Sequence, residues 1–145
     1  MDDCGLLKQA EFGCFKKSKV IDGIGLAACI PNVVKLLLKK GADVNKKEAK
    51  EGITALMYAT EKGHTGILKL LLDNGAEVNA KDNDGMTAIF LVTPPNPSHL
   101  EAISLLLDKG ADANVKDKDG MTALALARKN GNETVAKILE EAGGE

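Results

Sequence analysis

Leucine-rich segments followed by polar, glycine-containing segments recur at a nearly constant spacing along this chain of 145 residues. Leucine triplets occupy residues 36–38, 70–72 and 105–107. Each triplet is followed by a related motif, and the motifs GADVN, GAEVN and GADAN begin at Gly41, Gly75 and Gly110, which are 34 and 35 residues apart. A unit this short cannot bury its apolar side alone, so successive units must stack. The pattern therefore predicts a repeat protein whose functional surface extends over several units.

The pattern within one unit, residues 52–79, predicts two helices joined by a tight turn. The Thr54 hydroxyl can accept a hydrogen bond from a free backbone N–H, so we expect it to cap a first helix that runs to about Lys62. Gly63 can adopt the positive φ of a tight reversal, and a second helix should begin at residues 64–65. The apolar face of that second helix is formed by Ile67, Leu68, Leu70, Leu71 and Leu72.

The segment that follows each second helix is expected to project as a finger. Gly75 suits the left-handed position that ends a helix, and Asp84-Gly85 suits the tip of a turn. Thr87 and Thr122 stand where Thr54 stands and should cap the first helices of the next two units. The first finger is one residue longer than the others, since its bounding glycines are 41 and 52 rather than 75 and 85 or 110 and 120.

A two-residue insertion distinguishes the third repeat from its neighbours. It falls in residues 93–98, TPPNPS, which contain three of the four prolines of the chain. Proline fixes φ and removes an amide donor. We therefore expect the first helix of this repeat to end near Val92 or Thr93 and a stiff loop to protrude from Pro94 to Ser98.

With these motifs in place, the chain resembles the ankyrin-repeat family, whose unit of about 33 residues contains two antiparallel helices and a projecting β-turn. The family usually begins its first helix with TPLH, whereas this chain has TALM at 54–57, TAIF at 87–90 and TALA at 122–125. Met57, Phe90 and Ala125 cannot form the hydrogen bonds of a histidine. We therefore expect packing to replace the usual polar contacts between helix starts.

The resemblance implies an all-α fold, an ankyrin-repeat solenoid of about four to five stacked helix pairs with projecting β-turn fingers. We interpret residues 1–145 as one domain. Residues 1–40 would form degenerate N-terminal capping repeats. Regular repeats would occupy residues 41–75, 76–110 and 111–145.

Composition and charge narrow the classes of partner. The chain is 44% apolar and 28% charged, with a formal net charge of −2. Nucleic-acid affinity depends on basic patches that neutralise phosphates, so we expect no nucleic-acid partner. The apolar stretch 20–38 is interrupted by Asp22, Pro31, Asn32 and Lys35, so we expect no membrane partner either.

The three cysteines, Cys4, Cys14 and Cys29, lie in the first thirty residues and lack the paired spacing of a zinc site. Their odd number indicates free thiols in the cytoplasm or another reducing intracellular compartment. Their clustering leaves open an alternative function, a redox- or metal-responsive regulatory protein that acts through these N-terminal thiols.

No arrangement of residues predicts catalysis, a bound metal or a cofactor. The acidic runs 82–85 and 117–120 resemble the start of an EF-hand, but the twelfth loop position would be Leu91 or Leu126 instead of a bidentate glutamate. His64 and His99 each precede the terminal glycine of their repeat by eleven residues, so they occupy one structural position and do not form a catalytic pair. We expect a protein that is not an enzyme.

A register of apolar residues directly after the finger glycines is the strongest functional signal. Ile53, Met86 and Met121 share this register, which in the family faces the concave side between finger and first helix. Flexible methionines suit a contact surface, although these side chains could instead shield the base of each hairpin. We expect a monomer that binds a partner protein there. Polar residues expected to flank the surface are Lys50, Lys81, Asn83, Asp84, Lys116, Lys118, Asp119 and Lys129.

Overall fold

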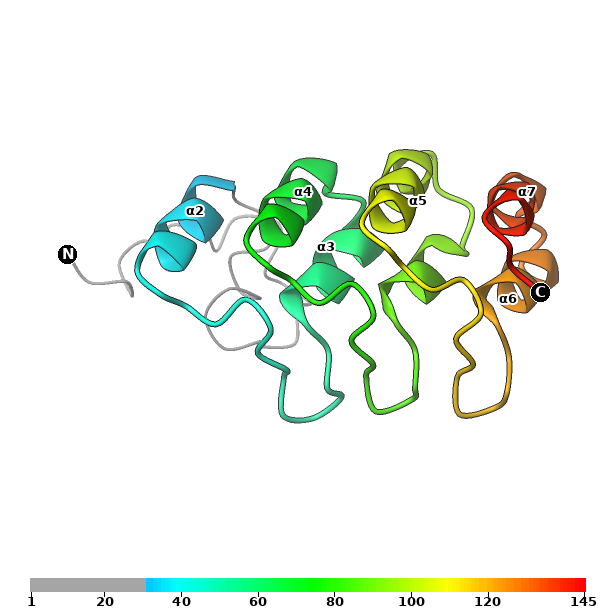
Figure 1. Ribbon diagram of the computed structural model, residues 1–145, viewed down its shortest axis with the longest axis horizontal. Coiled ribbons are helices and arrows are strands. Elements are labelled where there is room, and N and C mark those ends of the chain that lie inside the picture. The colour runs from blue at the N-terminus through cyan, green and yellow to red at the C-terminus, as the bar shows by residue number, and fades with distance from the viewer. Residues whose placement is uncertain (1–30) are drawn as a thin grey trace.

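The computed structural model describes residues 31–145, which fold into six α-helices and one 3₁₀ helix and contain no strand. The elements are α2 (Pro31–Lys39), α3 (Ala55–Lys62), α4 (Thr65–Asp73), η1 (Ala88–Val92), α5 (Ser98–Asp108), α6 (Ala123–Lys129) and α7 (Glu133–Glu141). In Figure 1 the helices α2, α4, α5 and α7 form an upper row, and α3, η1 and α6 lie below them. The all-α solenoid with stacked helix pairs is thus confirmed.

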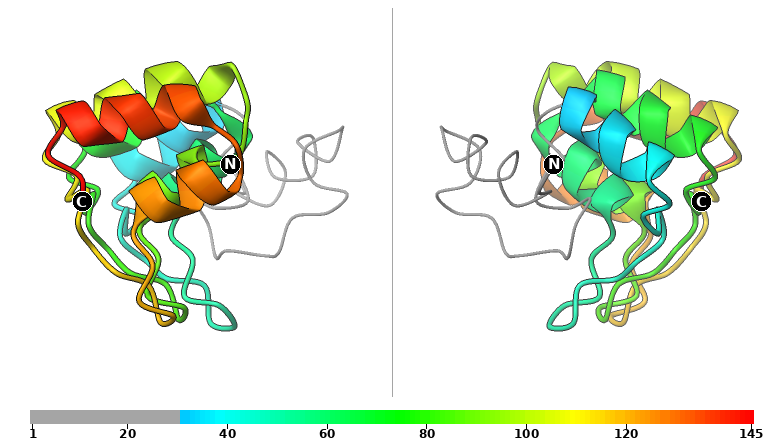
Figure 2. Two further views of the ribbon diagram at one scale, coloured as in Figure 1. Left: turned by 90° about the vertical axis from the view of Figure 1, so that its right-hand side faces the viewer. Right: turned by 90° about the vertical axis from the view of Figure 1, so that its left-hand side faces the viewer.

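Three complete helix pairs lie in the described part of the chain: α3 with α4, η1 with α5, and α6 with α7. Helix α2 packs against α4 as the second helix of a preceding unit. Between each second helix and the next first helix, the chain extends away from the helices as a finger, and Figure 2 shows the three fingers projecting to the same side. Residues 1–30, which include Cys4, Cys14 and Cys29, lie outside the described residues.

The helix ends follow the expected local chemistry in repeats two and four. The hydroxyls of Thr54 and Thr122 accept hydrogen bonds from Met57 N and Ala125 N, each at 3.3 Å. Gly63 has φ of 69° and Gly75 has φ of 88°, the left-handed conformation that a glycine adopts without steric cost. The predicted caps of α3 and α6 and both reversals are confirmed.

One continuous hydrophobic cluster connects the repeats. The middle position of the leucine triplet is buried in all four second helices, where Leu37, Leu71, Leu106 and Leu139 stand. Met57 and Phe90 at the helix starts are also buried, so packing does replace the expected histidine contacts there. Ala125 is exposed, and at this position the packing expectation was wrong, because α6 is the last first helix of the described residues and no further one covers it.

An acidic side chain closes each finger. Asp82 donates its main-chain N–H to Met86 O (2.9 Å), and its Oδ1 accepts from the N–H groups of Asp84 and Met86 (2.9 Å each). Asp117 makes the same contacts in the next finger, with Asp119 and Met121. The acidic runs therefore form turns, as the sequence register indicates.

The longer first finger uses a longer acidic side chain. Glu48 donates its N–H to Ile53 O (2.8 Å), as Asp82 does to Met86 O. Glu48 is only 8% exposed, and its carboxylate accepts from the N–H groups of Lys50 (2.6 Å) and Glu51 (2.7 Å). The extra residue of this finger is thus accommodated by the additional methylene of glutamate. Sequence analysis noted the extra residue but missed the role of Glu48.

Asparagines at the end of the GADVN-type motifs connect successive repeats. Asn79 donates through Nδ2 to Gly110 O (3.0 Å), and its Oδ1 accepts from Asp112 N (2.8 Å). Asn45 makes the equivalent pair of bonds to Gly75 and Glu77, and Asn114 makes them to Gly143 and Glu145. Each amide uses its donor and its acceptor together, which explains why the motif repeats this residue.

Repeat three departs from its neighbours at its first helix. Residues 88–92 form the 3₁₀ helix η1, which ends at Val92 as predicted. Thr87 has the extended backbone of a cap, but its side chain caps nothing, and its buried Oγ1 has no hydrogen-bond partner. The expectation that Thr87 caps by its side chain was wrong, since the 3₁₀ turn directs the Phe90 N–H to the main-chain oxygen of Thr87 instead (3.1 Å). The segment 94–98 is exposed, as the prolines predict.

The three equivalent threonines give a matched test of these caps. Replacing Thr54 by valine should lower the free energy of unfolding by about 0.5–2 kcal/mol, because the free N–H of Met57 loses its acceptor. Replacing Thr87 by valine should leave stability unchanged or raise it, because a buried hydroxyl without a partner is removed. Urea unfolding monitored by circular dichroism measures both. A large loss from Thr87→Val would contradict the absence of a partner for this hydroxyl.

Candidate functional site

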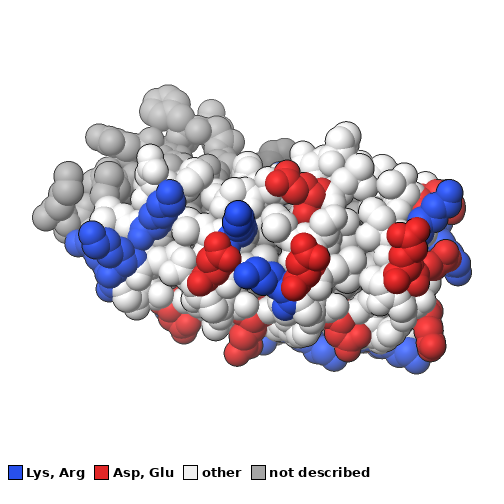
Figure 3. Space-filling model, turned by 45° about the horizontal axis from the view of Figure 1, so that its top comes forward, with Lys and Arg blue, Asp and Glu red and all other residues white. Residues whose placement is uncertain are grey.

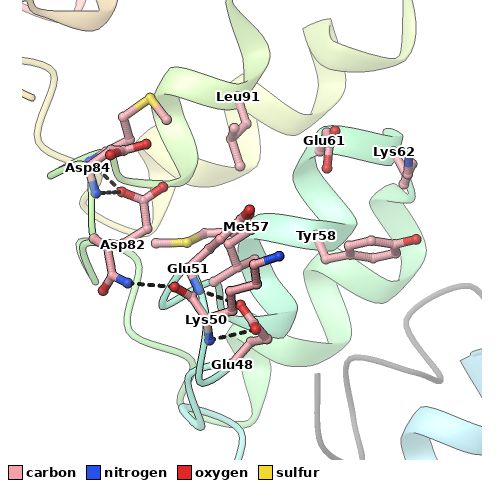
Figure 4. A pocket seen from close by; sticks show the side chains of 13 residues that line it. Glu48, Lys50, Glu51, Met57, Tyr58, Glu61, Lys62, Asp82, Asp84 and Leu91 are labelled. Atoms are coloured by element: carbon pink, nitrogen blue, oxygen red, sulfur yellow. Dashed lines mark hydrogen bonds between the residues drawn. The ribbon is translucent and has the colours of Figure 1, made fainter. Parts of the chain in front are cut away.

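A hollow of about 420 Å³ lies between the first two fingers and the first helices of repeats two and three. It is on the side of the molecule that the sequence register assigns to partner binding. Figure 4 shows its lining side chains, which come from the finger segments, from α3 and from η1, where Leu91 stands. The lining residues are Glu48, Lys50, Glu51, Ile53, Met57, Tyr58, Glu61, Lys62, Asp82, Asn83, Asp84, Met86 and Leu91.

Apolar side chains form part of the wall of this hollow. Met57 and Tyr58 come from α3, Leu91 comes from η1, and Ile53 and Met86 come from the bases of two adjacent fingers. Ile53 and Met86 are half-buried, line the hollow and also pack against the hydrophobic core. They therefore shield the hairpin bases and still keep exposed surface in the hollow, so both interpretations left open by the sequence remain compatible with the structure.

The charged side chains around the hollow are mostly acidic. Five carboxylates and two ammonium groups line it. Two of the carboxylates, Glu48 and Asp82, hold finger backbone in place, and Asp84 forms an ion pair with Lys118 (2.6 Å). This pair raises the pKa of the Lys118 ammonium, because hydrogen bonding and Coulomb attraction to Asp84 favour the charged form.

Lys62 places a cation beside the aromatic wall of the hollow. Its Nζ lies 5.6 Å from the centroid of the Tyr58 ring, within the range of a cation–π contact. The neighbouring His64 has a pKa below the usual histidine value, because burial disfavours the imidazolium and Lys62 repels it. The ammonium of Lys62 is thus the main positive charge at this end of α3.

The predicted binding residues fall into two groups. Lys50, Ile53, Asn83, Asp84 and Met86 line the hollow. Outside its lining lie Lys81, Lys116, Lys118, Asp119, Met121 and Lys129. The hollow therefore collects the candidates of the first two fingers except Lys81, and those of the last finger and of α6 lie beyond it.

Two of the predicted contact residues also hold adjacent fingers together. Asn83 donates its N–H to Glu51 O (2.9 Å) and its Nδ2 to Lys50 O (3.0 Å). Lys118 donates its N–H to Asp84 O (2.8 Å). The two main-chain bonds do not depend on side-chain type. A substitution of Asn83 would remove its Nδ2 bond to the first finger, and a substitution of Lys118 would remove its ion pair with Asp84, as well as any contact with a partner.

Sequence reasoning missed the contribution of the first helices to this site. Tyr58, Leu91 and Leu126 all stand six residues after a finger glycine, and Tyr58 and Leu91 line the hollow. Met57, Glu61 and Lys62 also come from α3 and line it. Counting first-helix positions from the preceding finger glycine could have identified these residues, because that count determines which face of the helix is next to the finger.

His99, the histidine of repeat three, has a structural role in which its ring contacts two main-chain segments. Both ring nitrogens of His99, which is 3% exposed, lie within hydrogen-bond distance of main-chain oxygens: 3.2 Å from Pro94 O and 3.1 Å from Glu61 O. The second contact joins the start of α5 to the end of α3. It therefore fixes the position of Glu61 at the edge of the hollow.

The face over the second helices differs from the hollow in its charge pattern. Acidic and basic side chains alternate along this face, as Figure 3 shows. A smaller hollow of about 280 Å³ is lined there by Lys35, Leu38, Lys39, Leu70 and Asn74 of α2, α4 and the residue after α4. The hollow beside the fingers is thus larger than this one, and its lining is mostly acidic where that of the smaller hollow has only basic charges.

No cluster of histidine, cysteine or acidic side chains between residues 31 and 145 has the arrangement of a metal site. Across the same described range, every helix is too short or too polar to traverse a lipid bilayer.

Comparison with known proteins gives one family. The family model described as ankyrin repeats (3 copies) matches residues 24–94 and 80–145. A search of curated proteins finds no match. Ankyrin repeats are generally protein–protein interaction modules, and the family is typically non-catalytic.

Proposed function

The chain belongs to the ankyrin-repeat family, and on this premise we propose that it is a non-enzymatic recognition module, or scaffold, that binds a partner protein on the concave face formed by fingers and first helices. The observation that carries this proposal is the hollow of about 420 Å³, which combines apolar side chains from two fingers with others from α3 and η1. Concave sites with an apolar lining and a few polar groups are the usual form of binding sites.

Apolar side chains would supply the anchors of this interface. Ile53, Met86 and Leu91 are half-buried, so a partner can remove their remaining surface from water. Met121 lies one repeat further along in the same register and extends the surface beyond the hollow. Charged residues on the fingers and helix ends would set orientation and association rate more than affinity.

The fingers are ordered by hydrogen bonds to one another, so they should lose little conformational entropy on binding. Hydrogen bonds from Asn83 and Lys118 to the preceding finger connect neighbouring turns. A surface that is already ordered loses less conformational entropy when a partner docks. We place the protein in the cytoplasm or another reducing intracellular compartment, on the basis of its odd number of cysteines, and expect it to act as a monomer.

Replacing Met86 and Met121 together by serine tests the proposed surface. The double variant should bind a captured partner about 5–30-fold more weakly, because two apolar contacts worth about 1–2 kcal/mol in total are lost. Isothermal titration calorimetry measures the dissociation constant. Because Met86 also packs against the core, the melting temperature must be measured alongside.

Leu100→Ser provides the matched control. Leu100 is 41% exposed on α5, among the second helices, so it offers a similar apolar loss away from the fingers. Its substitution should leave partner affinity unchanged. Equal affinities for wild type and the Met86/Met121 variant, at intact stability, would remove the concave face from the proposal.

A further inference from the structure

We propose that the hollow of repeat two accepts a basic side chain, arginine or lysine, from the partner protein. The inference rests on the proposed function and specifies what the concave face recognises. It follows from the charge of the lining residues, from the nature of the walls and from the way charge changes between repeats two and four.

The charge of the hollow favours a cation. Its lining contains five carboxylates against the two ammonium groups of Lys50 and Lys62, and the ammonium of Lys118, outside the lining, pairs with Asp84. The carboxylates of Glu48 and Asp82 accept hydrogen bonds from finger backbone. Glu61 stands near the end of α3, and its main-chain oxygen lies 3.1 Å from the His99 ring. This contact fixes the backbone of Glu61, from which its carboxylate extends at the edge of the hollow. A partner cation placed here meets a negative potential from several directions.

The walls suit the long apolar stem of such a side chain. The lining includes Met57, Tyr58, Met86 and Leu91 beside the acidic groups. Lysine and arginine bury their methylene groups against apolar surface while the charged head remains near polar groups. The hollow thus offers both kinds of contact that these two residues need.

Lys62 places a cation of the chain itself beside the aromatic ring of this site. Its ammonium lies 5.6 Å from the Tyr58 ring centroid. The face of an aromatic ring attracts a cation through its quadrupole. A basic residue of the partner would compete with Lys62 for this environment and would be repelled by its charge, so Lys62 lowers the affinity for such a partner.

The equivalent position in repeat four has the opposite charge. Glu61 stands nine residues after the finger glycine Gly52, and Lys129 stands nine residues after Gly120. At this one position the first helices therefore change from acidic in α3 to basic in α6, although Lys62 follows Glu61 in α3. A partner segment with a basic residue over repeat two would bind more tightly if it also had an acidic residue near repeat four. The two charges would determine the direction of the partner segment along the array.

Peptides selected for binding to the chain test the inference. A phage-displayed library of random dodecapeptides is selected on the immobilised full-length chain, and the enriched peptides are synthesised and titrated by fluorescence polarisation. We expect the enriched peptides to contain an arginine or lysine beside an apolar residue. Exchanging that residue for neutral citrulline or norleucine should weaken binding about tenfold, because charge-assisted contacts are lost.

Variants of α3 then locate the charge. Glu61→Gln should weaken binding of the peptides about threefold and Glu61→Lys about tenfold, whereas Lys62→Met should strengthen it about threefold. Glu77→Gln and Glu77→Lys are matched controls, because Glu77 is exposed and does not line the hollow. They should leave the affinity unchanged. Added salt should reduce the effects at Glu61 and Lys62 alike.

The alternative results separate this inference from the proposed function. Peptides that bind more tightly to Glu61→Gln and more weakly to Lys62→Met would show an acidic ligand and overturn the inference. Peptides insensitive to both, but weakened by Met86→Ser, would show a purely apolar contact, which overturns the inference and retains the proposed function. Peptides insensitive to Met86→Ser and Met121→Ser as well would overturn both.

Discussion

Replacing Phe90 by alanine is expected to lower the free energy of unfolding by about 3–5 kcal/mol. Phe90 is 2% exposed and belongs to η1, which packs against α3, α5 and α6. Removing the ring therefore leaves a cavity where three helices meet, in the centre of the array. Stability in a linear array depends on the interfaces between neighbouring repeats, so this cavity weakens both interfaces of repeat three at once. Urea unfolding measured by circular dichroism gives the change.

Phe90→Met serves as the control for this prediction. Repeat two has Met57 at the equivalent position, also buried, so methionine is compatible with this register. A replacement of similar volume that can repack should cost less than about 1.5 kcal/mol. If alanine and methionine cost the same, the packing account of this helix start is wrong, and a backbone effect on the 3₁₀ helix must replace it.

The regular parts of the fold could be predicted from the sequence because they depend on local chemistry that each repeat copies. The threonine caps of α3 and α6 require only a hydroxyl at the correct offset, and the reversal at Gly63 requires only a residue that tolerates positive φ. The end of η1 at Val92 follows from the prolines behind it. Each feature is determined by a few neighbouring residues.

Features that join different repeats were harder to predict. Thr87 has the same neighbours in sequence as Thr122, with Gly-Met before each, yet it makes no cap because the backbone after it winds as a 3₁₀ helix. The asparagine bonds between fingers cross about one full repeat, and no local rule assigns their partners. The role of Glu48 could be predicted only by comparing the lengths of the fingers, because its longer side chain compensates for the extra residue of the first finger.

The candidate site was anticipated in part for a similar reason. The apolar register of Ile53 and Met86 was visible because it repeats beside the finger glycine, and both residues do line the hollow. Tyr58 and Glu61 differ in type from their counterparts in repeat four, so a search for repeated residues passes over them. Residues that recur in every repeat mainly maintain the fold. A solenoid can therefore distinguish partners through the positions that differ between its repeats.

Glycine-to-alanine substitutions at two equivalent reversals are expected to differ strongly in effect. Gly63 and Gly131 each stand eleven residues after a finger glycine, with φ of 69° and 72°. Alanine in this left-handed conformation costs about 1–2 kcal/mol at either site. A Cβ at Gly131 would meet nothing within 4 Å, whereas a Cβ at Gly63 would overlap the Cβ of Ser98 at the start of α5.

Gly63→Ala should therefore cost about 2–5 kcal/mol in total, because overpacking between repeats adds about 1–3 kcal/mol to the backbone strain. Ser98→Gly removes the overlapping atom and gives a double-mutant cycle. In the Ser98→Gly background, the cost of Gly63→Ala should fall to that of Gly131→Ala in wild type. A cost at Gly63 equal to that at Gly131 in both backgrounds would mean that repeats two and three do not approach one another this closely. In that case the position of α5 against α3, and with it the contact from His99 that fixes Glu61 at the hollow, would have to be revised.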